Sequence, residues 1–306
     1  MFRPAIGLCF AMTLGLSAVA AVPSAVMTFS PPDTIKYLVK QISVQTRYTD
    51  TTVARVDSTT MVTDYLLTKS VSGFTLIGTP RPAVYTQNGV KIENEVSRIS
   101  SGIPVTLDIN VEGRALSATG YDLLGARIDS LPDKKMSQML KRLFKPQALA
   151  DQDVKEWNSR IGRLKDQRLR VGVLSGDTAS LKLGNGPSIQ LYSVTAILDT
   201  VRRDGVLCAV VRSATYTDIA ALAKAIKKSP AETKALLKLA DSLKTPADAH
   251  TWYRATTDVT IDAATLLIRD EKVRRDIQTP VTGKDGKPVN SRMVESIEKT
   301  YEYPKH

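Results

Sequence analysis

The stretch Ser188–Thr215, SIQLYSVTAILDTVRRDGVLCAVVRSAT, decides the fold of this chain. It holds two runs rich in β-branched and aliphatic residues, 189–201 and 206–211, separated by Asp204-Gly205. An Asp-Gly pair tolerates the positive φ angles of a tight hairpin turn. The stretch therefore predicts a long β-hairpin. Strands of this length indicate a large, twisted antiparallel sheet with a concave side that other elements must cover.

Strand patterns continue on both sides of this hairpin. They are dense in Thr, Val, Ile and Tyr, and turn dipeptides such as Thr49-Asp50 and Asn88-Gly89 separate them. Pro80 and Pro82 interrupt one run, which indicates an edge strand or a strand followed by a loop. The further predicted β segments are 35–48, 51–67, 73–85, 104–121, 169–183, 251–261, 265–277 and 292–303.

Two pairs of amphipathic helices interrupt the strands. The first pair is predicted over 130–144 and 151–164, and the second begins at Thr217 and at Ser229, where Ser-Pro-Ala-Glu forms a capping box. We therefore expect an α+β fold, in which a large curved antiparallel sheet, like a half-barrel, has two amphipathic helix pairs packed on or in it.

The chain organisation is predicted as a signal peptide over 1–20, a linker over 21–33 and one β-rich domain over 34–306. Asp108-Ile109-Asn110-Val111-Glu112 recurs 150 positions later as Asp258-Val259-Thr260-Ile261-Asp262. This echo fits a domain of two related halves, 34–166 and 167–306. The alternative is that any two hairpins with one solvent-exposed face have similar sequence patterns.

The first residues have the three parts of a secretory leader. Arg3 precedes an apolar run over 6–19, and Ala18-Val19-Ala20 is a cleavage pattern of small residues. The run is too short for a membrane anchor, and no basic stop-transfer cluster follows it. We expect an exported protein, periplasmic or extracellular, that does not span a membrane after cleavage. Cys208 then remains alone, so no internal disulfide can form.

The charge balance favours anionic partners. The chain has 42 Lys and Arg against 31 Asp and Glu, a formal net charge of +11. Outside the cytoplasm this favours an anionic envelope surface over nucleic acid, although a simply solvated surface is the alternative. The basic surface candidates, all on the predicted helices, are Lys141, Arg142, Lys145, Lys227, Lys228, Lys234 and Lys238.

The sequence offers few groups that could carry out catalysis or bind a metal. The histidines are His250 and His306, and without a second histidine or cysteine nearby a zinc site is not expected. Cys208 lies in a strand that is predicted to be buried, which does not suit a nucleophile. Asp258 and Asp262 share a strand face, but such pairs are usually just its polar side. No phosphate-binding loop or nucleophile elbow occurs. We expect no catalytic residue, metal or cofactor, and no enzyme activity.

Three segments carry a resemblance to a known class. They are VEGRALSATGY at 111–121, Arg203-Asp204-Gly205-Val206, and DVTIDAATLLI at 258–268. With them the chain resembles poorly characterised bacterial exported β-rich proteins akin to the periplasmic lipoprotein-carrier half-barrels. The resemblance implies an antiparallel sheet wrapped around helices. The carriers in this class shelter acyl chains in the gap between the sheet and the helices. It implies a fold more than an activity.

The expected function is binding. Met136, Met139, Phe144 and Trp157 are the candidates for lining an apolar ligand cavity, because methionines and large aromatics suit an irregular apolar site. The alternative is that they fill the core. Two main hypotheses follow: a carrier of a lipid or other apolar small molecule in the cell envelope, and an envelope scaffold with a basic surface and no cavity. A hydrolase that uses acidic residues is a distant third.

Overall fold

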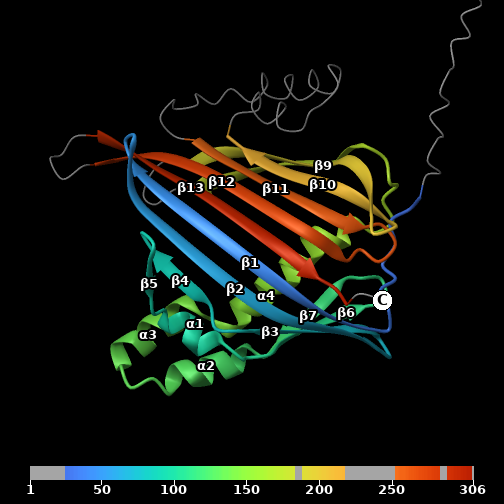
Figure 1. Cartoon of the computed structure of the whole chain (residues 1–306), viewed down its shortest axis with the longest axis horizontal. Helices are drawn as coiled ribbons and strands as arrows, with labels where there is room; N and C mark the ends of the chain where they lie inside the picture. Colours follow the sequence, from blue (N-terminus) through green and yellow to red (C-terminus); the bar gives the residue numbers. More distant parts are fainter. Residues whose placement is uncertain (1–24, 183–187, 218–251, 283–287, 305–306) are drawn as a thin grey trace, which may run out of the picture.

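The computed structural model describes residues 25–182, 188–217, 252–282 and 288–304. They form one curved antiparallel sheet of 13 strands with a few helices, as Figure 1 shows. This confirms the predicted α+β class and its large curved sheet. The predicted second helix pair, the signal peptide and both histidines lie outside the described residues, as do Lys227, Lys228, Lys234 and Lys238.

The strands follow one path across the sheet, in the order β7-β6-β3-β2-β1-β13-β12-β11-β10-β9-β8, while β4 pairs with β2 and β5 to one side. Their bounds are β1 Thr34–Thr49, β2 Thr52–Ser70, β3 Gly73–Pro80, β4 Val84–Gln87, β5 Val90–Ile92, β6 Val105–Asn110, β7 Ala115–Thr119, β8 Gly172–Lys182, β9 Ser188–Arg203, β10 Val206–Tyr216, β11 Trp252–Asp262, β12 Ile268–Thr282 and β13 Pro288–Glu302.

The hairpin that decides the fold is present as predicted. β9 and β10 pair from Val206↔Arg203 to Tyr216↔Tyr192. The turn residues Asp204 and Gly205 have φ angles of 50° and 78°. Positive φ at both central positions matches the right-handed twist of the flanking strands, which is why this dipeptide was informative.

The first and last strands of the described chain pair with each other. β1 and β13 run antiparallel from Leu38↔Glu302 to Thr49↔Ser291, between β2 on one side and β12 on the other. The echoed segments lie at the ends of β6 and β11, and each leads into a hairpin turn. The sheet is continuous through the β1–β13 pair, and a duplication of two halves stays a prediction.

Three helices form a satellite beside the sheet rather than a layer on it. They are α1 Glu95–Ser100, α2 Tyr121–Asp129 and α3 Lys134–Leu143, grouped at one corner in Figure 1. Their shared core consists of Ile99, Ile128, Leu131 and Leu140, with Val96, Leu124, Met136 and Phe144 at its margin. The apolar stripe of α3 therefore meets α2, a helix that the sequence analysis did not predict.

α4 Pro146–Trp157 is the helix that packs on the sheet, and a π-helical turn, η1 Asn158–Gly162, continues it. The side chain of Asn158 holds this junction on the edge strand β7. Its Oδ1 accepts from the Ala115 backbone N–H at 2.9 Å, and its Nδ2 donates to the Ala115 carbonyl at 3.0 Å. This helix was predicted from residue 151, but it starts five residues earlier, at Pro146. Pro146 was expected to end the preceding helix, and it also takes the first helical position of α4, where proline is well tolerated.

The core lies between the sheet and α4, and residues 25–30 seal one end of it. Met27 is fully buried, and the Phe29 ring lies edge-on to Phe74 and to Trp157, with ring centroids 5.3 and 6.3 Å apart. The backbone of this segment bonds to Gln167, Ala263 and Ala264. Part of the predicted linker is therefore a buried plug, which we call the N-terminal plug.

Candidate ligand-binding site

A pocket of about 370 Å³ lies between α4 and the inner face of the sheet, the face on which α4 packs. Its apolar wall includes Val39, Leu76, Leu107 and Ile161, all less than 9% exposed. Small-molecule sites are commonly apolar concavities of about 300 to 1,000 Å³ with a few polar groups. The size and the lining of this pocket fit that description.

Tyrosines form one side of the pocket. Tyr37 on β1 stacks on its cross-strand partner Tyr65 on β2, with ring centroids 5.1 Å apart and planes 12° apart. Tyr303 stacks on the other side of Tyr37 at 5.0 Å, and Tyr301 lies 6.4 Å from it. Burial raises the pKa of Tyr37 well above its usual range and raises the pKa of Tyr65 to about 12. These phenols therefore stay neutral hydrogen-bonding groups at ordinary pH.

Gly78 makes room for this tyrosine row. It is the cross-strand neighbour of Tyr65 on β3, and a Cβ atom there would lie 2.7 Å from Cε1 of the Tyr65 ring. The glycine thus lets the ring of Tyr65 lie over the β3 backbone. We call the stack of Tyr37, Tyr65, Tyr301 and Tyr303 the tyrosine row. The first three line the pocket, and Tyr303 extends the stack beyond it.

A buried charged cluster joins the helix to the sheet behind the pocket. Glu271 on β12 is fully buried, and its Oε2 lies 3.0 Å from Nη1 of Arg160 and 3.1 Å from Nζ of Lys299. The hydroxyl of Tyr301 donates to the same oxygen at 3.3 Å. Nη2 of Arg160 also bonds Glu156 at 2.6 Å. Arg160, Lys299, Tyr301 and Glu156 line the pocket, while Glu271 stands behind them.

Near the pocket, one oxygen of Glu271 is unpaired within the described ranges, and the Asp153 carboxylate is bonded to a neutral group. Oε1 of Glu271 has no hydrogen-bond partner among the described residues. Asp153 on α4 lines the pocket and accepts a hydrogen bond from the Tyr121 hydroxyl of α2. Burial raises the pKa of Asp153, and the nearby Glu156 carboxylate raises it further.

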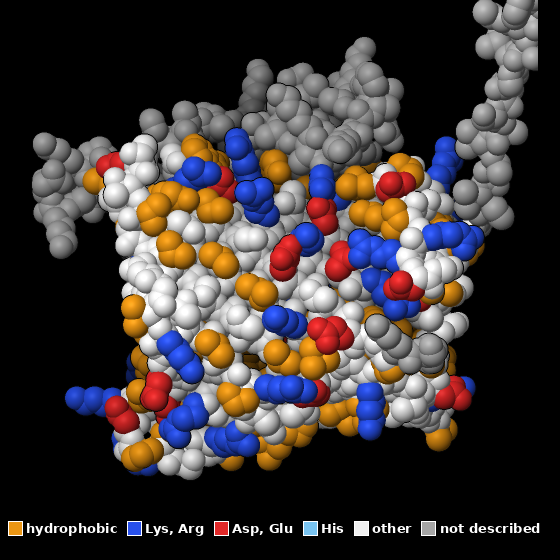
Figure 2. Space-filling view, viewed as in Figure 1, with side chains coloured by type: hydrophobic (Ala, Val, Ile, Leu, Met, Phe, Trp, Pro, Cys, Tyr) orange, Lys and Arg blue, Asp and Glu red, His pale blue; other side chains and the backbone are white. Residues whose placement is uncertain are grey.

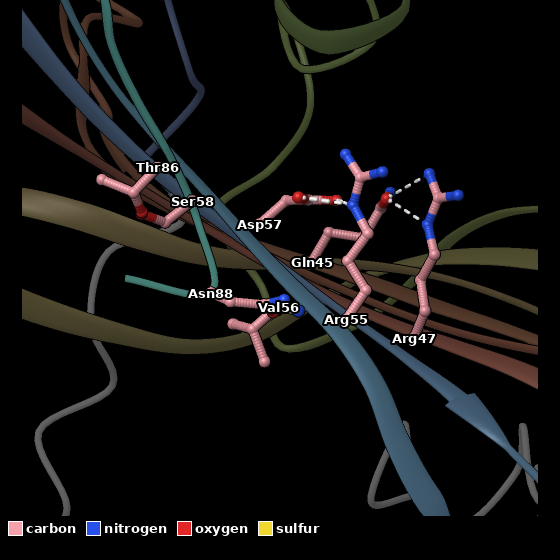
Figure 3. Close-up of polar contacts among 8 residues, drawn as sticks. All are labelled: Gln45, Arg47, Arg55, Val56, Asp57, Ser58, Thr86 and Asn88. Atoms are coloured by element: carbon pink, nitrogen blue, oxygen red, sulfur yellow. Dashed lines mark hydrogen bonds and ion pairs between the residues drawn. The ribbon is translucent and has the colours of Figure 1, made fainter. Parts of the chain in front are cut away.

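The inner face becomes polar along the same strands. Beyond the pocket, β1 and β2 carry Gln45, Arg47, Arg55 and Asp57 instead of aromatic and aliphatic side chains. Figure 3 shows Arg55 bonded to Asp57, at 2.7 Å, and Arg47 bonded to Gln45, at 2.9 and 3.1 Å. We call the part of the inner face around Tyr37 and Tyr65 the pocket end, and the part around these four residues the polar end.

Of the four residues predicted to line a cavity, the structure places only Trp157 in the pocket. Its indole Nε1 donates to the Gly113 carbonyl at 2.9 Å. Met136 and Phe144 pack at the margin of the satellite core, and Met139 is 53% exposed. Helical spacing had shown that α3 is amphipathic, but it could not show that the partner of its apolar stripe is α2.

The basic candidates on the described helix are exposed. Lys141 forms an ion pair with Asp129, and Arg142 and Lys145 are exposed near the end of α3. On the face seen in Figure 2, Lys and Arg side chains are interspersed with acidic and hydrophobic ones and do not form a single patch. A bound anionic envelope surface stays a prediction.

Other residues that the sequence singled out have structural contacts. Asp258 forms an ion pair with Arg212 at 2.5 Å. Asp262 accepts from the backbone N–H groups of Ala264 and Thr265 and lies 3.2 Å from Arg269. Cys208 is fully buried, as expected, and burial raises the pKa of its thiol.

Among residues 25–182, 188–217, 252–282 and 288–304, no group of three or more His, Cys, Asp or Glu side chains is arranged to hold a metal ion. No helix in the same part of the chain has the length and apolar character needed to cross a membrane.

The sequence matches no protein-family model and no curated protein. Among solved structures, the fold is similar to one described as "lipid-protein interactions in lipovitellin", at 9% identity and a TM-score of 0.37, over 91% of this chain and 26% of that one. It is also similar to Pseudomonas aeruginosa OccK5 (OpdH), at 9% identity and a TM-score of 0.23, over 89% and 99%. The chain spans about a quarter of the lipovitellin chain. Likenesses at these scores carry no argument about function.

Proposed function

We propose that this protein is an exported, non-enzymatic binding protein that shelters a lipid or another apolar small molecule in the pocket between α4 and the sheet. The observation that carries the proposal is the pocket itself, about 370 Å³ in volume, with buried aliphatic walls and a tyrosine row. A scaffold that only packs its helices on its sheet has no need of such a space. The resemblance to lipoprotein-carrier half-barrels supports the same reading.

The shape of the pocket end fits a ligand whose apolar part is small. The N-terminal plug closes the hollow at one end through Met27 and Phe29, and the inner face turns polar beyond Gln41 and Met61. Apolar shelter is therefore confined to the region between these limits. A long acyl chain stretched along the strands would have to lie on Gln45 and Asp57, where its burial would desolvate polar groups without new hydrogen bonds.

The test is to fill the pocket. Thr63 lines it from β2, and Thr63→Trp places an indole in the space. Thr60→Trp is the matched control, because residues three apart on a strand lie on opposite faces. Native mass spectrometry of the full chain purified from its own host should show a bound apolar species on the wild type and on Thr60→Trp, but not on Thr63→Trp.

A second readout uses Trp157, which lines the pocket. An environment-sensitive uncharged dye such as N-phenyl-1-naphthylamine should receive energy from Trp157 in the wild type, and Thr63→Trp should weaken dye binding by about tenfold. If the wild type carries no apolar species and the dye binds both variants equally, the proposal is wrong.

Export is the part of the proposal that rests on residues 1–20 alone. Cleavage after Ala20 would leave a chain that begins at Ala21. The mass of the protein recovered from the periplasm or the medium should match that product. A chain that keeps residues 1–20 and stays in the cytoplasmic fraction would contradict it.

A further inference from the structure

The ion pairs among the residues that line the pocket in the described part of the chain do not include one of its carboxylates, that of Asp153. Glu271 and Glu156 neutralise Arg160 and Lys299, because both terminal nitrogens of Arg160 and the ammonium of Lys299 bond these two acids. Arg160 and Lys299 are the cations that line the pocket in the described part of the chain. Asp153 also lines it, and its bonded partner there is the neutral Tyr121 hydroxyl.

The aromatic residues Tyr65, Tyr121 and Trp157 share the pocket with this remaining carboxylate. Asp153 accepts from Tyr121, and its charge acts on the phenol of Tyr65, contributing to the raised pKa of that group. Trp157 lies one helical turn further along α4 and lines the same space. A carboxylate among aromatic rings suits an ammonium group, because the ring faces attract a cation and the carboxylate accepts its hydrogen bonds.

A second acceptor points to the same kind of ligand. Glu271 is fully buried, and its Oε1 has no partner among the described residues. A buried acceptor without a donor is costly. The carboxylate touches three residues that line the pocket, Arg160, Lys299 and Tyr301, and lies behind them. Within the described part of the chain, the groups next to the pocket that are incompletely paired are thus acceptors, one carboxylate without a cation and one oxygen without a donor. A ligand that supplies a donor suits them better than one that supplies an acceptor.

We propose that the ligand is a cationic amphiphile, with an ammonium head bound by Asp153 between Tyr121, Tyr65 and Trp157 and an apolar body against the aliphatic wall. This inference rests on the proposed binding function and names the class of ligand. The net charge of the whole molecule favours anions instead of cations. A chain of formal net charge +11 attracts anions non-specifically, so a preference for a cation must arise locally, at the pocket.

The test compares three probes with the same apolar body: decylammonium, decanol and decanoate, each below its micelle concentration. Isothermal titration calorimetry on the full chain should show decylammonium binding most tightly and decanoate most weakly. Asp153→Asn keeps an acceptor for Tyr121 and removes the charge. It should weaken decylammonium binding by about tenfold or more and leave decanol binding within about twofold.

The matched control is Asp151→Asn. Asp151 is exposed on the same helix and accepts from Gln147, so this change alters net charge equally without touching the pocket. Decylammonium should bind it as it binds the wild type. Salt should weaken decylammonium binding to the wild type and to Asp151→Asn, but hardly to Asp153→Asn.

The outcomes separate the two proposals. If decanoate binds the wild type as tightly as decylammonium, or if Asp151→Asn weakens decylammonium binding as much as Asp153→Asn, the cationic head is wrong and the apolar pocket stands. If none of the three probes binds the wild type, the proposed function itself fails. The ranking of the probes on the wild type decides the matter even if Asp153→Asn does not fold.

Discussion

The pocket end and the polar end of the inner face are built on the same two strands, yet they differ in chemistry. At the pocket end, Tyr37 and Tyr65 pair across β1 and β2 and face α4. At the polar end of the same strands, Arg47 pairs with Arg55. Strand alternation decides which face a side chain joins, whereas the covering by α4 and the N-terminal plug decides which length of that face is apolar. A curved sheet therefore need not be an apolar trough along its whole length.

The largest expected difference between the two ends lies in their ion pairs. Glu271→Ala should lower the free energy of unfolding by about 3 to 5 kcal/mol, because it leaves Arg160 and Lys299 close together without their buried carboxylate. Asp57→Ala breaks the half-exposed pair with Arg55 at the polar end and should cost about 1 kcal/mol or less. Urea denaturation measures both values, and equal losses would contradict the contrast.

The N-terminal plug gives the next largest effect. Met27 is fully buried in the main core, so Met27→Ala should lower the free energy of unfolding by about 2 to 5 kcal/mol through lost burial and a cavity. Its neighbour Val26 is 47% exposed, and Val26→Ala should change stability by about 0.5 kcal/mol at most. Thermal and urea denaturation of both variants test whether the N-terminal plug contributes to the stability of the core. A neutral Met27→Ala would show that it does not.

The tyrosine row predicts a loss of stability in alkali. An unfolded tyrosine has a pKa of about 10, whereas Tyr65 in the folded protein has a pKa of about 12. Between these values the unfolded state binds fewer protons, so stability that is complete below pH 10 falls as the pH rises towards 12. Tyr65→Phe should make that fall shallower by up to about 1.4 kcal/mol per pH unit. Urea midpoints from pH 9 to 12 measure it, and an unchanged slope would contradict the burial of the phenol.

The smallest effect is expected at the polar end and has the opposite sign. Arg47 and Arg55 are direct cross-strand partners, and like charges in that position repel. Arg47→Thr should raise the free energy of unfolding by about 0.2 to 0.5 kcal/mol at low salt, and 1 M NaCl should abolish the gain. Arg47→Lys keeps the charge and should show no gain. A loss of stability in Arg47→Thr would mean that this arginine holds the two strands together.

Much of the sheet could be predicted from the sequence, because its signals are local. Asp204-Gly205 and Asn88-Gly89 lie at turns with positive φ at both positions, and runs dense in Thr, Val, Ile and Tyr mark β1 and β2. α2 was missed because it follows β7 directly, and its N-cap is Gly120, which has no side chain to signal a helix start. Because α2 was not predicted, the surface on which α3 packs could not be predicted either.

The site was harder to predict because its parts lie far apart in the chain. Tyr37 and Tyr301, which both line the pocket, come from opposite ends of the sequence. Glu271 lies in a run of charged residues on β12, and nothing local distinguishes it from its exposed neighbour Lys272. Its burial depends on Arg160 and Lys299, which reach it only in the folded protein. Of the predicted cavity residues, Trp157 was found because the helical stripe of α4 does face the sheet.

The pairing of β1 with β13 has a consequence for how this protein acquires its structure. The pairing runs from Leu38↔Glu302 to Thr49↔Ser291, so β1 has no neighbour on that side until β13 has been synthesised. Contacts so distant along the chain form slowly. A nascent chain that lacks β13 therefore keeps one edge of β1 unpaired, and such an edge is open to pairing with another chain.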